Sequence, residues 1–190
     1  MTVILISGKS GSGKDTLAAA MKEILINEHK RPLIIHFADM VKAFARLYYN
    51  WNGIKDTSGR ELLQKLGTNI VRAYDKNYWA RQIAEFIAAE SQIDDFDCAI
   101  IPDARFPNEI EITKLYNKDT YSVRIERDNY LNPQLTEEQH AHASETALDN
   151  YTEFDYIFQL PYNIPDYLEQ FKSHASLILK DINLIGETND

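Results

Sequence analysis

Residues 8–14 have the sequence Gly8-Lys9-Ser10-Gly11-Ser12-Gly13-Lys14, and the fold prediction starts from them. The stretch has the pattern G-x-x-x-x-G-K, follows a short apolar run at 2–7 and precedes a helical pattern at 14–28. In that context the pattern predicts a phosphate-binding loop between a buried strand and a helix. Glycines let backbone N–H groups turn inward around phosphate oxygens, and the helix N-terminus adds partial positive charge. The candidate nucleotide-binding residues are Gly8, Ser10, Gly11, Ser12, Gly13, Lys14, Asp15 and Thr16.

Lys14 is the candidate catalytic residue of this loop. Its ammonium group can reach the β- and γ-phosphates of ATP and follow the charge during transfer. The residue after the lysine is usually Ser or Thr, but here it is Asp15, with Thr16 next. Two interpretations stay open. Either Thr16 contacts Mg²⁺ or a phosphate while Asp15 acts through a magnesium-bound water, or Asp15 only complements the positive end of the helix.

Strand and helix patterns alternate along the rest of the chain. This alternation predicts an α/β fold of P-loop NTPase type, a three-layer structure in which helices cover both faces of a five-stranded parallel sheet. The strands are expected at 2–7, 32–38, 96–105, 120–127 and 153–160. The helices are expected at 14–28, 40–49 (with Asp39 as N-cap), 60–73, 76–91, 108–116 and 164–180, with a loop at 51–59 and a loop or small helical flap at 128–145.

The composition limits the kind of protein. The chain has 190 residues, a single cysteine, Cys98, and a formal net charge of −9. One cysteine excludes an intrachain disulfide and a Cys-based metal cluster, which favours a reducing, cytoplasmic setting. The acidic balance argues against general nucleic-acid binding, because duplex binding needs a basic surface. No apolar run is long enough to cross a membrane, so we expect no membrane partner.

Four segments together resemble bacteriophage deoxynucleoside monophosphate kinases. They are SGKSGSGKDT (7–16), LLQKLGTNIVRAYDKNYWARQIAEF (62–86), IIPDARFPNEIE (100–111), and VRIERD (123–128) followed by HASE (142–145). The resemblance spans about residues 3–160 in the same order, and the combination is more specific than the loop alone. It implies ATP and Mg²⁺ as cofactors and a deoxynucleoside monophosphate as the small-molecule acceptor. It also suggests a phage source, with the enzyme acting in the cytoplasm of a bacterial host.

The resemblance also implies a domain organisation, a single P-loop kinase domain. Its expected parts over 1–190 are a core at 1–50, 95–127 and 150–182, a helical acceptor-binding region at about 51–92 and a lid at about 128–147. The chain is shorter than the best-known phage members, and the residues that it lacks relative to them fall between positions 50 and 60. Base preference therefore does not carry over from the family. The sequence leaves the oligomeric state undecided, with a homodimer as one option.

Three residues at the ends of the predicted strands are candidates for the chemistry. Asp103 ends the third strand and Arg105 lies two residues on, near the carboxyl edge where open α/β sheets bind ligands. Asp103 can hold Mg²⁺ through water or orient the acceptor phosphate; the alternative is a cap on the turn before the next helix. Arg105 can form a bidentate contact with a phosphate, and the alternative is an ion pair with Glu109. Arg127 leaves the fourth strand just before the flap, where a lid arginine would enter and offset transition-state charge. Arg124, on the same strand, is a secondary candidate for this role.

The acceptor-binding region supplies further candidates. Arg60 and Arg72 can grip the acceptor phosphate, or either can be a solvated charge on a helix. Tyr78 and Trp79 can stack on a base or shape the sugar pocket, whereas an aromatic pair on an amphipathic helix is more often core.

The reaction predicted from these features is ATP plus a deoxynucleoside monophosphate giving ADP plus the diphosphate. The acceptor phosphate is ionised near neutral pH, so positioning and cations should dominate and no dedicated general base is needed. One alternative keeps the fold and changes the acceptor to dephospho-coenzyme A or phosphomevalonate. Another is a non-enzymatic nucleotide-binding switch. The Asn/Thr-Lys-x-Asp segment that would read GTP in such a switch is missing from the sequence.

Overall fold

The computed structural model describes residues 1–54, 56–93, 95–128, 130–161 and 165–186. The predicted acceptor region, flap, closing helix and C-terminal end contain or adjoin residues that lie outside the described ones, namely 55, 94, 129, 162–164 and 187–190. In the described parts of the chain, no helix combines the length and the apolar character needed to span a membrane.

Five parallel strands form one sheet, in the order β2-β3-β1-β4-β5. The central strand β1 pairs in parallel with β3 on one side and with β4 on the other. All seven residues of β1 are buried, as expected for a central strand covered on both faces. The strands are β1 (Thr2–Gly8), β2 (Pro32–Ile34), β3 (Cys98–Ala104), β4 (Thr120–Arg127) and β5 (Tyr156–Leu160). The predicted five-stranded parallel sheet is confirmed.

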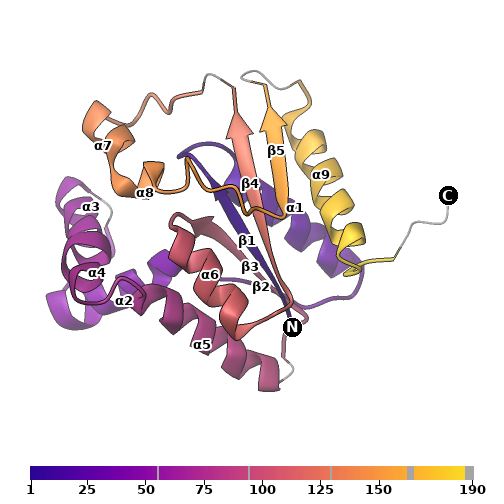
Figure 1. Cartoon of the computed structure of the whole chain (residues 1–190), viewed down its shortest axis with the longest axis horizontal. Helices are drawn as coiled ribbons and strands as arrows, with labels where there is room; N and C mark the ends of the chain where they lie inside the picture. Colours follow the sequence, from indigo (N-terminus) through magenta and orange to yellow (C-terminus); the bar gives the residue numbers. More distant parts are fainter. Residues whose placement is uncertain (55, 94, 129, 162–164, 187–190) are drawn as a thin grey trace.

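Helices cover both faces of the sheet, which gives the three layers predicted (Figure 1). One apolar cluster joins α1 and α9 to one face of the sheet through residues such as Leu17 and Phe171. A second cluster joins α5 and α6 to the other face through residues such as Ile83 and Ile110. The main helices of these layers are α1 (Lys14–Asn27), α2 (Phe37–Tyr49), α5 (Tyr78–Ile93), α6 (Pro107–Tyr116) and α9 (Tyr167–Asp181).

The second strand ends earlier than predicted and α2 begins earlier. Strand β2 stops at Ile34, and the prediction of Asp39 as N-cap of α2 is wrong, because His36 holds that position. The Asp39 carboxylate lies one turn inside the helix and accepts a hydrogen bond from the His36 backbone N–H at 3.0 Å. This is the second half of a capping box, so the acidic residue still marks the start of the helix.

The region predicted to bind the acceptor, about 51–92, is largely helical, but the single helix expected at 60–73 is divided into three elements. They are α3 (Thr57–Gln64), the π-helix η1 (Lys65–Ile70) and α4 (Val71–Tyr74). The Gly67 carbonyl of the π-helix accepts side-chain hydrogen bonds from Arg72 Nε at 3.1 Å and Trp79 Nε1 at 3.2 Å. The Trp79 bond connects the π-helix to α5, and π-helical turns occur frequently at functional sites.

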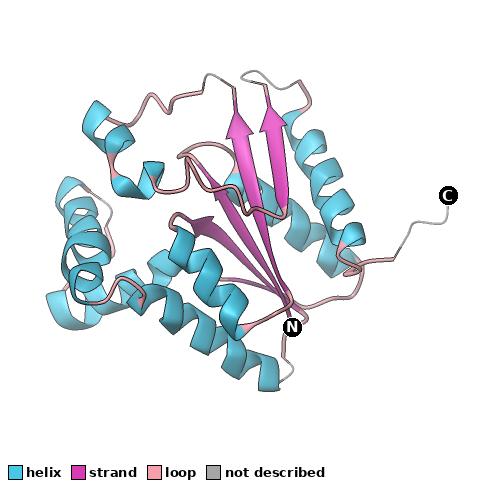
Figure 2. Cartoon of the chain, viewed as in Figure 1, coloured by secondary structure: helices cyan, strands magenta, loops and turns pink. Residues whose placement is uncertain are grey.

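The flap consists of two short helices joined to β4 and β5 by loops (Figure 2). They are α7 (Glu137–Ala141) and α8 (Ala143–Thr146). His142 caps α8, since its Nδ1 accepts a hydrogen bond from the Ser144 backbone N–H at 3.2 Å. The described residues of 128–145 thus have the loop and short-helix structure expected of them, while their role as a lid stays a prediction.

Candidate functional site

The loop after β1 has the backbone geometry that a phosphate-binding loop requires. Gly11 and Gly13 have φ angles of 79° and 105°, in the left-handed region that favours glycine. A Cβ on Gly11 would clash with the Tyr130 ring, and a Cβ on Gly13 would clash with Phe171 and Tyr167. Both glycines are therefore required by the backbone and by close neighbours.

Lys14 is buried beneath this loop. Its ammonium donates hydrogen bonds to the carbonyl oxygens of Gly8 and Lys9, both at 2.8 Å. Burial, with a smaller contribution from the Arg105 charge, lowers the pKa of Lys14 from its usual 10.5 to about 8. A ligand phosphate would offer the ammonium a stronger, charged acceptor than these carbonyls.

We expect kcat/KM for ATP to fall as the pH rises through about 8, because kcat/KM reports ionisations of the free enzyme and Lys14 loses its proton there. Below that pH the charged ammonium attracts the phosphates, and above it the neutral amine does not. The measurement is kcat/KM at fixed acceptor concentration between about pH 6.5 and about pH 9.5, on either side of the lowered pKa.

Lys14→Arg is the matched control for this profile. Its guanidinium keeps its charge throughout the range, so its lower activity should show no decline near pH 8. A wild-type profile that stays flat above pH 8, or an arginine variant that declines like the wild type, would contradict the assignment.

Asp15 and Thr16 follow Lys14 at the start of α1. The Asp15 side chain is 88% exposed, and its carboxylate lies 3.7 Å from His36 Nε2. Thr16 Oγ1 lies 3.4 Å from the Tyr167 hydroxyl. Both side chains present oxygen atoms of the kind that Mg²⁺ prefers. The described residues contain no group of three or more His, Cys, Asp or Glu side chains arranged to hold a metal. A magnesium ion needs no such cage, because it retains waters and takes further oxygens from phosphates.

Asp103 lies at the carboxyl end of β3, as expected, and caps a helix. Its two carboxylate oxygens accept hydrogen bonds from the backbone N–H groups of Phe37 and Ala38, at 2.9 and 3.0 Å. The capped helix is α2, whereas the capping alternative drawn from the sequence concerned the helix that follows Asp103. Burial raises the pKa of Asp103, and the two backbone N–H groups oppose that shift. Each oxygen retains a lone pair for a water or a magnesium-bound water.

Arg105 pairs with the flap. Its guanidinium forms an ion pair with Glu145 and donates a hydrogen bond to the Ser144 carbonyl at 3.2 Å. The other Glu145 oxygen accepts a hydrogen bond from the Ser10 backbone N–H at 2.8 Å. Strand β3, the flap and the phosphate-binding loop therefore meet at one carboxylate. Glu109, the ion-pair partner considered for Arg105 from the sequence, instead accepts from the Arg105 backbone N–H at 2.7 Å.

A second acidic residue, Asp149, follows the flap in the sequence and joins the loop to the sheet. Its carboxylate forms an ion pair with Lys9 of the loop and lies 3.4 Å from Arg124 Nη2. Arg124 is buried in β4 and donates a hydrogen bond to Ser7 Oγ at 3.0 Å. Lys9 also donates to the Glu145 carbonyl at 2.7 Å. The base of the flap is thus tied to the loop by several charged contacts.

A cavity of about 370 Å³ lies beside this meeting point. Its lining combines Arg105 and Glu145 with side chains from the acceptor-binding region, among them Arg60, Arg72 and Trp79. The structure therefore brings together the predicted acceptor residues and the predicted phosphate-binding arginine of β3. Other lining residues are Phe37, Val41, Lys42, Leu63, Gln64, Gly67, Thr68, Asp103, Phe106, Glu109, Leu135, Gln139 and His142.

Arg72 is held within the wall of this cavity and is not a solvated helix charge. Its guanidinium forms an ion pair with Glu109, donates to the carbonyls of Gly67 and Lys76, and lies 4.1 Å from the centroid of the Phe106 ring. Glu109 is 2% exposed and also caps the start of α6. Arg72 and Glu109 therefore fasten the acceptor helices to the strand end that carries Arg105.

Trp79 is primarily a core residue. It is 2% exposed, and its ring packs edge-on against Phe44 and Tyr78. It belongs to a third apolar cluster that supports the acceptor helices, with Val41 and Leu66 among its members. Trp79 reaches the cavity as part of its wall.

Arg127 lies over the outer side of the phosphate-binding loop. Its guanidinium carbon is 4.7 Å from the Tyr130 ring centroid and 5.8 Å from that of Tyr167, and its Nη1 lies 3.5 Å from the Gly11 carbonyl. The structure thus brings Arg127 to the loop, while Arg60 lies in α3 and lines the cavity.

Sequence reasoning missed the role of Lys9, Glu145 and Asp149. Lys9 is a variable position of the loop motif, and Glu145 is one of several acidic residues in a polar segment. Their pairing spans 136 residues and more along the chain, so no local spacing could have indicated it.

The fold is shared with solved structures, kinases among them. A sugar kinase from Janibacter sp. HTCC2649, unliganded, aligns with a TM-score of 0.57 at 15% identity, covering 96% of this chain and 95% of that one. Shikimate kinase from Aquifex aeolicus vf5 gives 0.51 at 14% identity, covering 97% and 100%. The Deinococcus radiodurans tunicamycin resistance protein gives 0.53 at 12% identity, covering 95% of each chain. These similarities establish the P-loop kinase fold alone. A search for relatives among curated proteins found no match.

A family model with the description deoxynucleotide monophosphate kinase matches residues 25–174. The matched part is more than half of the 190 residues and contains the acceptor helices, β3, β4 and the flap. It begins after the phosphate-binding loop at 8–14, so the loop and the family match are separate observations. The chain therefore belongs to the deoxynucleotide monophosphate kinase family.

Proposed function

We propose that the chain transfers the γ-phosphate of ATP to a deoxynucleoside monophosphate, giving ADP and the diphosphate. The observation that carries the proposal is the position of Arg105, which lines the cavity and shares the Glu145 carboxylate with Ser10 of the phosphate-binding loop. A phosphoryl group moving between two bound ligands needs a cation between them. Family membership supports a nucleotide as the acceptor.

The cavity suits a phosphorylated nucleoside as acceptor. Its volume of about 370 Å³ falls within the range typical of small-molecule sites. Arg105 provides the cation for the phosphate, while Leu63 and Trp79 offer apolar surface to a base or sugar. Gln64 and Thr68, also in the lining, provide hydrogen-bonding groups for a base edge.

The proposed chemistry relies on positioning and on cations. Lys14 and the loop N–H groups hold the phosphates of ATP, and Arg105 and Arg127 offset the charge that spreads over the transferred group. Arg60 helps to hold the acceptor phosphate. Arg72 acts by keeping the acceptor helices in place, because its own hydrogen bonds are directed at Gly67, Lys76 and Glu109.

Asp15, Thr16 and Asp103 are the residues proposed to hold the magnesium ion, directly or through water. When bound, Mg²⁺ supplies charge neutralisation at the β- and γ-phosphates. Asp103 contributes from a fixed position, because both of its oxygens are anchored on the first turn of α2.

The flap, as the proposed lid, excludes water from the transferred phosphate, since a kinase that admits water hydrolyses ATP.

The test is a coupled ADP-release assay with ATP and Mg²⁺ against dAMP, dGMP, dCMP, dTMP, hydroxymethyl-dCMP and the corresponding ribonucleotides. We expect turnover with at least one deoxynucleotide, and the ranking among them gives the base preference. Dephospho-coenzyme A and phosphomevalonate belong in the same panel. Turnover with either of these and with none of the nucleotides would replace the proposed acceptor.

A further inference from the structure

The Glu145 carboxylate has the surroundings of a bound anion. The side chain is 7% exposed, although it comes from a short helix of the flap. One oxygen pairs with the Arg105 guanidinium, and the other accepts from the Ser10 backbone N–H at 2.8 Å. A guanidinium and a loop N–H group are the donors that phosphate sites in proteins use.

The surrounding charges fit the same interpretation. The Lys14 ammonium, which should hold a phosphate, donates instead to the carbonyls of Gly8 and Lys9. The Glu145 charge is close enough to act on the pKa of Lys14, which it raises against the effect of burial. The Glu145 carboxylate thus accepts hydrogen bonds from Arg105 and from a loop N–H group, while the Lys14 ammonium donates to carbonyls of the loop itself.

We infer that Glu145 occupies the position of a substrate phosphate, so that a phosphate and the Glu145 carboxylate cannot be bound at this position together, and phosphate binding releases this part of the flap. The inference rests on the proposed phosphoryl-transfer function. It deepens that function by giving the flap residue a role in setting phosphate affinity.

Electrostatics require the exchange. A phosphate that reached Arg105 with Glu145 in place would add its charge next to a carboxylate that is largely removed from water. Both anions also need the same donors, and a displaced buried donor without a partner is costly. The incoming phosphate therefore takes over Arg105 and Ser10 N–H, and Glu145 moves out with its short helix.

The neighbouring contacts define what moves and what stays. The Asp149 carboxylate holds Lys9 and Arg124, and neither contact involves the donors that the phosphate needs. His142 caps α8 through its own ring and travels with that helix. The exchange therefore moves α8, and the Glu145 carbonyl gives up its hydrogen bond from Lys9, while the Lys9–Asp149 ion pair keeps the base of the flap attached to the loop.

A phosphate can bind only to molecules in which Glu145 has left Arg105. The apparent affinity for phosphate ligands is therefore the intrinsic affinity multiplied by the fraction of such molecules. Glu145→Gln keeps the shape but removes the charge, and its amide cannot accept from both donors at once. We expect this variant to bind inorganic tripolyphosphate and ATP about tenfold more tightly than the wild type, on the scale of one charge-assisted hydrogen bond. Isothermal titration calorimetry without any acceptor measures both affinities.

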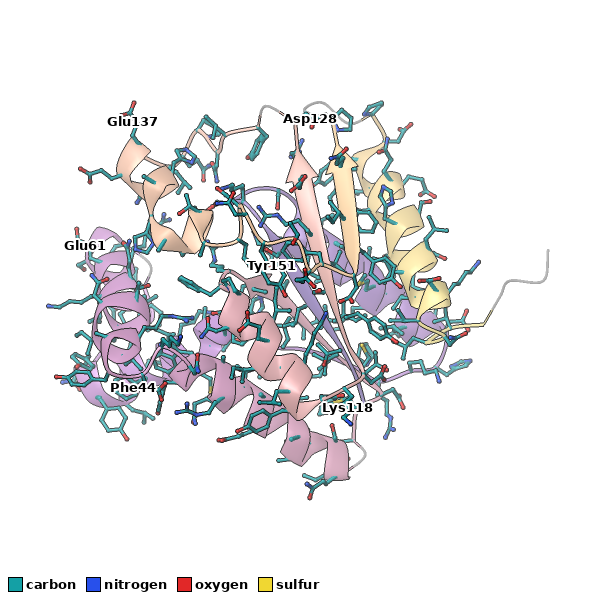
Figure 3. All side chains as sticks on the ribbon, in the orientation of Figure 1. Phe44, Glu61, Lys118, Asp128, Glu137 and Tyr151 are labelled. Atoms are coloured by element: carbon teal, nitrogen blue, oxygen red, sulfur yellow. The ribbon has the colours of Figure 1, made fainter. Side chains whose placement is uncertain are left out.

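Glu137→Gln is the matched control, since it removes the same charge from the same flap. Glu137 lies in α7 and its side chain points away from the sheet (Figure 3). Its affinities should match the wild type. Glu145→Asp retains the charge but shortens the reach, so it should fall between the wild type and Glu145→Gln and provides a second variant if the glutamine protein folds poorly.

Hydrogen–deuterium exchange gives a readout that affinity alone does not. In the wild type, tripolyphosphate should speed exchange in α8, and in Glu145→Gln exchange there should already be fast without ligand. Unchanged or weaker binding by Glu145→Gln, or tripolyphosphate that protects α8 in the wild type, would overturn the inference. No tripolyphosphate binding by any variant would overturn it too, because there would be no phosphate position to occupy. These binding experiments contain no acceptor. A negative result would therefore overturn the role given to Glu145 without deciding whether the protein phosphorylates nucleotides, which the turnover assay tests.

Discussion

Replacing Lys14 by alanine is expected to lower kcat by about 1,000-fold, the scale seen when a preorganised charge at the transferred group is removed. The Lys14 ammonium lies beneath the loop at a fixed position, held by the carbonyls of Gly8 and Lys9. Lys9 cannot take its place because it is engaged with Asp149, and in the proposed mechanism Arg105 and Arg127 already have their own roles at the transferred group. The measurement is the turnover number at saturating ATP and acceptor.

Lys22→Ala is the control for this prediction. Lys22 lies in the same helix, α1, and is exposed, so its removal should leave kcat within about twofold, as for surface substitutions remote from a site. If Lys14→Ala retained most of the wild-type turnover, the loop would not be the site of phosphoryl transfer.

Replacing Glu109 by alanine should have the largest effect on stability, a loss of about 3–5 kcal/mol in the free energy of unfolding, as for a broken buried ion pair. The carboxylate accepts from the backbone N–H groups of Arg105 and Phe106 at 2.7 and 3.1 Å, and pairs with Arg72. Alanine would leave these donors without their acceptor, and the Arg72 side chain is only 12% exposed. Denaturant unfolding with linear extrapolation measures the loss.

Glu111→Ala in the same helix provides the comparison, because Glu111 is exposed and should change the unfolding free energy by less than about 0.5 kcal/mol. A double-mutant cycle of Glu109→Gln with Arg72→Met separates the ion pair from the cap of α6, since only the pair couples the two sites. Additive losses in that cycle, or a Glu109→Ala protein as stable as the wild type, would contradict the structural role given to this carboxylate.

The parts of the fold that the sequence predicts well are those in which local pattern and tertiary context agree. The loop at 8–14 and the apolar run before it determine both the first strand and the start of α1. Strand β4 has the predicted limits, and the start of α6 is marked by Pro107 at its first turn, where proline costs no hydrogen bond.

The parts that the sequence does not predict depend on contacts between distant residues. Helix α2 begins earlier than its apolar pattern indicates because Asp103, more than 60 residues away, supplies acceptors for its first N–H groups. The π-helix at Lys65–Ile70 depends in part on Trp79 and Arg72 bonding to the Gly67 carbonyl. Neither bond leaves a periodic signal in the sequence.

The same distinction between local sequence pattern and contacts between distant residues applies to the candidate site. The loop residues and Arg105 are predictable, because motif spacing and the carboxyl end of a parallel strand place them. Trp79 shows the limit of this reasoning, since the same helix position serves the core and the cavity wall. Glu145 reaches the loop only because the chain returns to it after β4, and that return is a property of the folded structure.

Transfer of a phosphoryl group to a deoxynucleoside monophosphate can be followed with ATP that carries ³²P in its γ-phosphate, because the product then carries the label. Wild-type protein is incubated with Mg²⁺, labelled ATP and each deoxynucleoside monophosphate, and the products are separated by chromatography. The proposed function predicts label in the β-phosphate of at least one deoxynucleoside diphosphate, and none with Lys14→Ala. Label that appears only as inorganic phosphate, or stays in ATP with every acceptor, would contradict it.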